Sequence, residues 1–313
     1  MKILITGADG FIGSHLTEML VTQGHEIIAL SQYNSFNNWG WLEDVNCKSK
    51  IKVLAGDIRD PHYCKYITKD VDIIFHLAAL IAIPYSYVAP DSYVDTNIKG
   101  TLNICQAAKE NGNIRLIHTS TSEVYGTAQY VPIDENHPMQ PQSPYSATKI
   151  AADAMAMSFY NAFGLPVTIA RPFNTYGPRM HPDDGRVVSN FIVRALRGEP
   201  LAVYGDGNQT RSFCYVDDLV KALITFMGSE PGFTGPVNLG NPSEFTIKDL
   251  AQQVISLTGS TSKIAYGALP EDDPKQRQPD ISLAQKALDW QPEIPLDTGL
   301  PKTIEYFKQI LGD

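Results

Sequence analysis

Short apolar runs alternate with stretches of helical spacing through the first 172 residues. Such near-continuous apolar runs are typical of strands in a parallel sheet that helices cover on both faces. The intervening stretches 12–23, 91–111 and 146–163 have the spacing of helices. This order predicts an α/β fold with a doubly wound parallel sheet. The runs that we expect to be strands are 2–6, 25–30, 51–56, 72–78, 115–121 and 166–172.

The pattern changes after residue 173, where turn-forming and polar residues become frequent. We therefore expect a sheet domain over residues 1–173 and a smaller substrate-binding lobe over 174–313. A short apolar run near 237–240 is expected to return as a strand to the main sheet. The pattern also predicts helices over 187–197, from an N-cap at Thr246 to Gly259, and over 297–311.

Composition narrows the classes of function. A net charge of −9 argues against a nucleic-acid-binding surface, which normally needs a basic patch. The four cysteines are scattered without metal-ligand spacing, so we expect free thiols in a reducing compartment and no metal site. The amino-terminal residues do not resemble a signal peptide, and no stretch approaches the roughly 20 apolar residues that span a bilayer. The sequence thus predicts a cytoplasmic protein with no membrane partner.

A glycine-rich turn follows the first expected strand at once. Gly7, Gly10 and Gly13 form G-x-x-G-x-x-G and open the first expected helix. This spacing variant of the dinucleotide fingerprint predicts a Rossmann-like site, with the pyrophosphate at the helix amino terminus. The second strand ends in Ser31 and Gln32, with neither a carboxylate for the ribose nor an arginine for a 2′-phosphate nearby. We expect NAD as the cofactor, and the sequence leaves NADP open.

A hydroxyl, a carboxylate, a phenol and an amine form the candidate catalytic set. Thr121 and Glu123 follow a strand, at the sheet edge where doubly wound folds bind ligands. Tyr145 and Lys149 lie one helical turn apart on the same face. A neighbouring ammonium favours the phenolate of a tyrosine. The tyrosine is then able to remove a hydroxyl proton while a hydride leaves the same carbon for the cofactor, with the threonine bonded to that oxygen.

The whole chain resembles the extended short-chain dehydrogenase/reductases that modify nucleotide sugars. The matching motifs are TGADGFIG (6–13), HLAA (76–79), TNIKGTLN (96–103), STSEVYG (120–126), YSATK (145–149) and RPFNTYGPR (171–179). This resemblance implies NAD(P)-dependent oxidation of carbon 4 of a sugar. The residues that we expect to contact the cofactor are Gly7, Gly10, Phe11, Ile12, Gly13, Ser31, Asp57, Ile58, Leu77, Ala78, Ala79, Tyr145 and Lys149.

Two subfamilies compete for the reaction. The stretches 32–41 and 76–97 resemble 4,6-dehydratases of the legionaminic-acid type, whereas 178–191, 203–220 and 272–282 resemble UDP-glucuronate decarboxylases. Many dehydratases carry Asp-Glu after the threonine, but this chain has Ser122 and Glu123, which match the decarboxylases too. We favour a 4,6-dehydratase of a UDP- or GDP-linked N-acetylhexosamine, because the sugar-facing stretch lies in the dehydratase-like half. A UDP-glucuronate decarboxylase or a 4-epimerase is the alternative.

The resemblance also implies substrate contacts and a partner. Arg186 and Arg211 have the fork geometry that suits a diphosphate. We expect helices near 93–110 and 146–163 to pair in a homodimer. A non-catalytic NAD(P)-sensing protein is the competing class, although a sensor has no need of an activated phenol. The residues that we expect to contact a nucleotide sugar are Pro84, Tyr85, Ser86, Asn174, Arg186, Arg211 and Arg277.

Overall fold

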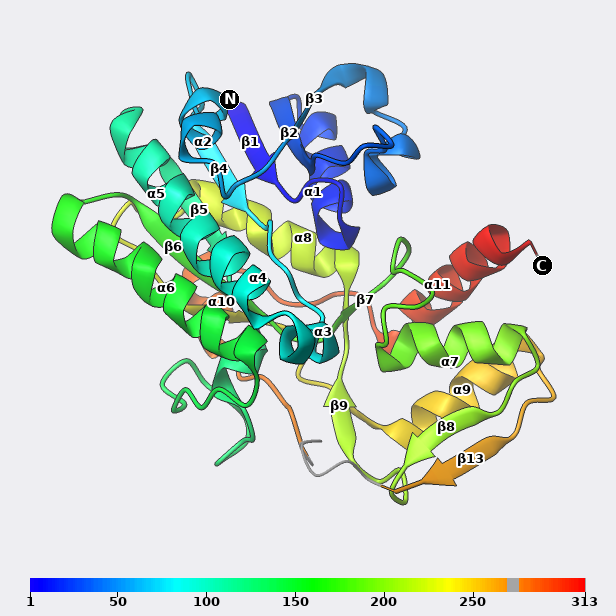
Figure 1. The fold of residues 1–313 in the computed structure, drawn as a ribbon. Helices are drawn as coiled ribbons and strands as arrows, with labels where there is room; N and C mark the ends of the chain where they lie inside the picture. Colours follow the sequence, from blue (N-terminus) through cyan, green and yellow to red (C-terminus); the bar gives the residue numbers. More distant parts are fainter. Residues whose placement is uncertain (269–275, 313) are drawn as a thin grey trace. The chain divides into compact units, whose positions relative to one another are not determined.

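The computed structural model describes residues 1–268 and 276–312 and contains a seven-stranded sheet (Figure 1). The strand order is β11-β6-β5-β4-β1-β2-β3, and the pairings from β3 to β6 are all parallel. The predicted doubly wound fold is therefore confirmed. The strands are β1 (Lys2–Thr6), β2 (Glu26–Gln32), β3 (Ile51–Gly56), β4 (Ile73–His76), β5 (Arg115–Thr119), β6 (Val167–Pro172) and β11 (Val237–Leu239).

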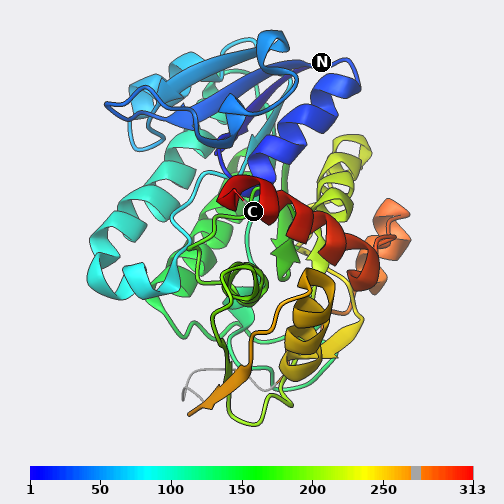
Figure 2. The same cartoon turned by 90° about the vertical axis from the view of Figure 1, so that its right-hand side faces the viewer.

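Helices cover both faces of this sheet. α2 (Pro61–Ile67), α5 (Gly100–Glu110) and α6 (Pro144–Phe163) pack side by side, whereas α1 (Phe11–Thr22) contacts β1 and β2. Figure 2 shows α1 and the α5–α6 layer on opposite sides of the sheet. Alternate residues of the strands face the layer formed by α2, α5 and α6. Together with side chains of these helices they form a hydrophobic core, to which the helices contribute Ile67, Ile104, Ala108, Ala156 and Phe159.

Local sequence explains where α6 begins and ends. Ser143 and Ser146 form a capping box, and Pro144 occupies the first turn, where its missing N–H costs nothing. Gly164 ends the helix in the left-handed conformation that favours glycine. These signals place Tyr145 in the first turn of α6 and Lys149 one turn later.

The helix predicted over 91–111 has a more complex structure. It consists of α4 (Pro90–Tyr93), a π-helix η3 (Val94–Lys99) and α5 in succession. The wider turn of a π-helix changes which side chains face the core, and such turns often occur at functional sites. Here it buries Asn97, which is 1% exposed.

The chain divides into two compact units. The first comprises residues 1–126, 139–172 and 220–237, and the second comprises 127–138, 173–219 and 238–313. Besides the predicted helices α7 (Val187–Leu196), α9 (Ile247–Thr258) and α11 (Leu296–Leu311), the second unit contains short two-stranded sheets. Thr246 caps α9 as predicted, by accepting a hydrogen bond from the Asp249 amide.

The second unit's short strands were not predicted. β8 (Leu201–Tyr204) pairs with β13 (Ile264–Gly267), β9 (Thr210–Ser212) with β12 (Glu244–Thr246), and β7 (Thr175–Tyr176) with β10 (Cys214–Tyr215). Strands of two to four residues are too short to show a period of two in the sequence. Within residues 1–268 and 276–312, no helix has both the length and the apolar character needed to cross a membrane.

Candidate active site

The glycine-rich turn lies where the strand order reverses, between β1 and β4. Gly7 has a φ of +69°, and a Cβ added there would lie 2.8 Å from the amide nitrogen of Ala78. A Cβ on Gly13 would lie 2.1 Å from the carbonyl oxygen of Gly7. Only glycine permits this close packing, which brings the predicted cofactor residues of the first turn beside Leu77 and Ala78. Open α/β sheets bind their ligands at such a switch point.

The amino terminus of α1 is suited to a phosphate. Gly10 is its N-cap, provides no side-chain cap, and is followed by Phe11, Ile12 and Gly13 in the first turn. First-turn N–H groups have no acceptor inside their own helix, and the helix dipole adds positive potential there. These residues therefore fit the pyrophosphate of a dinucleotide.

The end of β2 holds a carboxylate that the sequence did not reveal. Asp9, from the glycine-rich turn, accepts hydrogen bonds at Oδ2 from Ser31 Oγ (3.0 Å) and from the Gln32 amide (3.1 Å). Asp9 and Ser31 are far apart in sequence, so only the pairing of β1 with β2 brings them together. The predicted cofactor residue Ser31 is thus bonded to a second candidate contact.

The end of β3 has its own ion pair. Asp57 accepts hydrogen bonds from Arg59 Nε and from the Arg59 amide, and the hydrogen bond from this guanidinium lowers the pKa of Asp57. Ile58 is buried, and its carbonyl oxygen accepts from Asn103 Nδ2 (2.9 Å). The Ile58 side chain packs in the hydrophobic core beside β3. The Asp57 carboxylate faces Arg59, which belongs to the same loop.

Asn97 fixes the segment that follows β4. Its amide group accepts from the Leu80 amide (2.9 Å) and donates to the Leu80 carbonyl (3.0 Å) and to Thr148 Oγ1 (3.0 Å). Thr6 Oγ1 accepts from the Ala78 amide at the other end of the segment. The predicted contacts Leu77, Ala78 and Ala79 are thereby tied to β1, η3 and α6. The π-helical turn that aims Asn97 is not visible in the sequence.

The predicted catalytic residues of the first unit come from two adjoining elements. Thr121 caps the short helix η4 (Ser122–Tyr125) by accepting from the Glu123 amide, and η4 packs against α6. Ser122 is 3% exposed, whereas Glu123 is half-buried. Tyr145 is 7% exposed in the first turn of α6.

Lys149 is a buried cation. It is 4% exposed, and its Nζ donates to the Thr119 carbonyl at the end of β5 (2.7 Å). Burial lowers the pKa of Lys149 from 10.5 to about 8, and the charge of Asp153 partly opposes this effect. The lysine therefore remains mostly charged at neutral pH, as the stabilisation of a phenolate requires.

A buried polar cluster lies one turn further along α6. Asp153 Oδ2 accepts from Ser120 Oγ (2.8 Å) and pairs with Arg171 Nη2 (3.2 Å), and its Oδ1 faces His118 Nε2 (3.3 Å). Burial opposes ionisation of Asp153, but the neighbouring His118 ring and the charge of Arg171 lower its pKa overall. Burial and the charge of Lys149 lower the pKa of His118. In this cluster the Asp153 carboxylate is therefore paired with the Arg171 guanidinium, one helical turn from Lys149.

An aromatic row leads from the predicted sugar-facing stretch to Tyr145, the predicted catalytic tyrosine. The ring centroids of Tyr85 and Tyr93 are 6.1 Å apart, and those of Tyr93 and Tyr145 are 6.2 Å apart. Pro84 opens α3 (Ile83–Val88), and Ser86 is fully buried with its hydroxyl bonded to the Ile83 carbonyl. Tyr85, by contrast, is 50% exposed and accessible to a ligand.

The other predicted substrate residues belong to the second unit. Arg211 on β9 and Arg277 are 9% and 7% exposed, and Arg186 is the N-cap residue of α7. Gln276, next to Arg277, donates to Glu244 of β12, the strand that pairs with β9. The backbone carbonyl of Asn174 accepts from the Cys214 amide. Residues 272–275 of the decarboxylase-like stretch lie outside the described residues.

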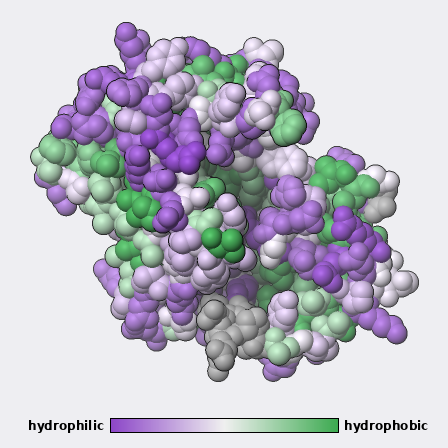
Figure 3. Space-filling view, in the orientation of Figure 1, coloured by the Kyte–Doolittle hydropathy of each residue, from purple (hydrophilic) through white to green (hydrophobic). Residues whose placement is uncertain are grey.

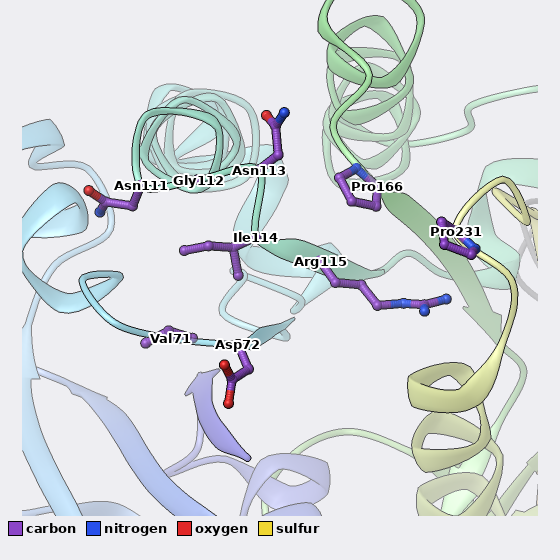
Figure 4. Close-up of a pocket in the computed structure, with 9 residues that line it drawn as sticks. All are labelled: Val71, Asp72, Asn111, Gly112, Asn113, Ile114, Arg115, Pro166 and Pro231. Carbon is purple, nitrogen blue, oxygen red and sulfur yellow. The ribbon is translucent and has the colours of Figure 1, made fainter.

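A hollow lies at the amino-terminal edge of the sheet, at the opposite end of the strands from the glycine-rich turn and Thr121. Asp72 there accepts from the Lys2 amide, and Arg115 Nη2 donates to Ser229 Oγ. Burial lowers the pKa of Arg115. None of the predicted site residues lines this hollow, so the candidate site is the carboxyl-terminal edge. The residues that line the hollow are Val71, Asp72, Asn111, Gly112, Asn113, Ile114, Arg115, Pro166 and Pro231 (Figure 4).

Known proteins share this arrangement over the full chain. UDP-glucuronic acid decarboxylase 1 of Danio rerio is 42% identical over 318 residues, covering 99% of this chain and 73% of that protein. UDP-glucose 4-epimerase of Thermotoga maritima, solved with UDP-glucose, matches with a TM-score of 0.92 at 31% identity, covering 99% of this chain and 100% of the other. UDP-glucuronic acid 4-epimerase of Bacillus cereus, solved with UDP-glucuronic acid and NAD, matches with a TM-score of 0.89 at 30% identity, with coverages of 99% and 100%.

The family described as GDP-mannose 4,6 dehydratase matches residues 4–303. Proteins similar to this chain thus include decarboxylases and epimerases as well as a dTDP-glucose 4,6-dehydratase of Streptomyces venezuelae. The curated relatives favour the decarboxylase alternative over the N-acetylhexosamine dehydratase that the sequence favoured. The chain belongs to the GDP-mannose 4,6-dehydratase family, within the extended short-chain dehydrogenase/reductases that act on nucleotide sugars.

Proposed function

We propose that this protein is an NAD-dependent decarboxylase of UDP-glucuronate. The observation that carries the proposal is the residue after Thr121. A 4,6-dehydratase must protonate a departing hydroxyl, but Ser122 is a poor acid and its side chain is buried. A decarboxylase has no hydroxyl to expel. The identity with UDP-glucuronic acid decarboxylases over the whole chain supports the same choice.

The residues of the first unit fit the initial oxidation. Tyr145 removes the proton from the hydroxyl on carbon 4, and Thr121 hydrogen-bonds the same oxygen. Lys149 stabilises the tyrosine phenolate through its charge. NAD supplies the acceptor for the hydride of carbon 4, and the glycine-rich turn, Ser31 and Leu77–Ala79 would hold it. The resulting ketone lies β to the carboxylate of the sugar, so carbon dioxide leaves readily. The bonding electrons that it leaves behind form an enolate with the ketone, and a proton then adds to carbon 5.

We also assign the substrate contacts of the second unit. Arg186 and Arg211 bind the diphosphate, since a guanidinium donates two parallel hydrogen bonds to phosphate oxygens. Arg277 and Asn174 complete these contacts. Arg211 also suits the carboxylate of glucuronate.

A 4,6-dehydratase is the second candidate. Glu123 favours it, because this half-buried carboxyl is the one group beside Thr121 that is able to act as both base and acid. A decarboxylase instead loses carbon dioxide from carbon 5, and the proton already on that carbon stays in place. Glu123→Gln therefore separates the two reactions: it abolishes dehydration and leaves decarboxylation within about tenfold of wild type.

The test compares three substrates by mass spectrometry of the products. Purified protein is incubated with UDP-glucuronate, UDP-N-acetylglucosamine and GDP-N-acetylglucosamine, with Tyr145→Phe as the inactive control. We expect loss of carbon dioxide from UDP-glucuronate alone. Loss of water from an N-acetylglucosamine substrate establishes the dehydratase instead, and an isomer of unchanged mass indicates a 4-epimerase.

We further propose a homodimer that pairs helices from the α5–α6 layer of each copy. Exposed apolar side chains support this, namely Val88 (80%), Val94 (47%) and Phe163 (48%), and hydrophobic surface is visible over this side of the first unit (Figure 3). Light scattering behind size exclusion tests it. We expect twice the mass of the chain, and Phe163→Asp is expected to yield monomer.

A further inference from the structure

The adenosine end of the proposed cofactor site has an unusual acid. In this fold, the residue that ends β2 normally supplies a carboxylate that binds the ribose hydroxyls of NAD. Here β2 ends in Ser31 and Gln32, which carry no charge. The carboxylate of Asp9 reaches this position from the glycine-rich turn, as its bonds to Ser31 Oγ (3.0 Å) and to the Gln32 amide (3.1 Å) show.

Hydrogen bonds to both its backbone and its side chain hold Asp9 in place. Its carbonyl oxygen accepts from the Trp41 amide (3.0 Å), and a Cβ on Gly40 would lie 2.7 Å from that oxygen. Gly40 has a φ of +53°, a conformation that favours glycine. The loop after β2 therefore closes over the Asp9 backbone. Both side-chain bonds use Oδ2, so Oδ1 is oriented by the same contacts and is able to accept from a ribose hydroxyl.

The surroundings of Asp9 offer little to a 2′-phosphate. Residues 3–47 contain no lysine or arginine. Arg59, at the end of β3, is bonded to both carboxylate oxygens of Asp57. A phosphate beside Asp9 would meet a fixed negative charge, and like charges in contact are strongly unfavourable.

We infer that Asp9 selects NAD over NADP, in place of the acid that β2 lacks. Its free carboxylate oxygen accepts from the adenosine ribose, and its charge repels a 2′-phosphate. This inference rests on the proposed function only in that the protein binds a nicotinamide dinucleotide. It does not depend on which sugar reacts.

The test is nucleotide binding to protein from which the retained cofactor has been removed. Calorimetric titration of the wild type with NAD and with NADP is expected to give a preference for NAD of about 100-fold. Asp9→Asn keeps an oxygen that accepts from Ser31 and Gln32 but removes the charge. We expect it to narrow the preference to less than about tenfold, with a gain in NADP affinity.

One variant controls for a change of net charge elsewhere in the loop. Asp44→Asn changes the net charge equally at an exposed position of the nearby loop and should leave the preference unchanged. If Asp9→Asn does not fold, the wild type is titrated with ADP-ribose and 2′-phospho-ADP-ribose, and comparable affinities overturn the inference.

The possible failures are distinguishable. An unchanged NAD to NADP ratio in folded Asp9→Asn overturns the inference and leaves the proposed function intact. Equal losses for both nucleotides overturn it too, since Asp9 then only shapes the loop. A wild type that binds neither nucleotide overturns the proposed function itself.

Discussion

Replacing Lys149 with Met should stabilise the folded protein while it abolishes turnover. The lysine is 4% exposed, and burial lowers its pKa from 10.5 to about 8. This shift corresponds to about 3 kcal/mol of unfavourable free energy for the charged form at pH 7. The variant also loses the hydrogen bond to the Thr119 carbonyl, worth about 1 kcal/mol. We therefore expect Lys149→Met to gain about 2 kcal/mol in free energy of unfolding at pH 7.

The pH dependence of the stability difference between Lys149→Met and wild type tests this reasoning more sharply than the size of the difference at pH 7. Between pH 8 and 10.5 the unfolded wild type binds more protons at this lysine than the folded wild type, so wild-type stability rises with pH there. The free-energy cost of burying the charged Lys149 is fully present below pH 8 and disappears as the pH approaches 10.5. The advantage of the variant should shrink by about 2 kcal/mol between about pH 7 and about pH 9.5.

Urea unfolding of both proteins without nucleotide, at several pH values, measures this difference. Bound cofactor would add its own stabilisation to each curve, so it must be absent. Lys52→Met serves as the control, because Lys52 is exposed on β3. It should shift the unfolding curve equally at every pH. A constant difference between wild type and Lys149→Met across this range would refute the claim that burial of the charge destabilises the fold.

Three further predictions follow from the same site. Tyr145→Phe should lower turnover by about 10²- to 10⁴-fold and keep the bound nucleotide, whereas full retention of function would indicate a sensor. Gly13→Ala places a Cβ 2.1 Å from a backbone oxygen, so it should abolish nucleotide retention; Gly228→Ala, which meets nothing within 4 Å, is the control. Asp153→Ala leaves the guanidinium of β6 buried without its carboxylate and should cost about 3–5 kcal/mol in urea unfolding. Ser120→Ala, which removes one hydrogen bond, should cost about 1 kcal/mol, and equal losses would contradict this account.

The main sheet could be predicted from the sequence because its signals are local. Each of its first six strands is a short apolar run, and the predicted positions agree with β1 to β6 to within a few residues. The amino terminus of α6 is encoded by adjacent residues, Ser143, Pro144 and Ser146. Where helix or strand propensity, apolar pattern and capping residues agree, a short window of sequence is enough to predict the element and its ends.

The small strands of the second unit lacked such signals. β8 and β13 are four residues each and lie some sixty residues apart in the chain, and their register depends on contacts that no window contains. The π-helical turn at Val94–Lys99 was missed for a related reason. The π-helical turn covers only six residues inside a longer helical stretch, which is too short to change the overall apolar spacing, so the sequence predicted one continuous helix.

Asp9 shows why residues of a site are harder to predict than the strands that carry them. The ribose-binding acid of this fold is expected at the end of β2, but β2 ends in Ser31 and Gln32, and neither is an acid. The carboxyl ends of parallel strands converge at one edge, so a side chain from the turn after β1 is able to occupy the same place. The hydrogen bonds to Ser31 and Gln32 put the Asp9 carboxylate there. A site in this fold is therefore specified by which groups reach a point in space, and a strand end without its expected acid is a reason to search the neighbouring loops.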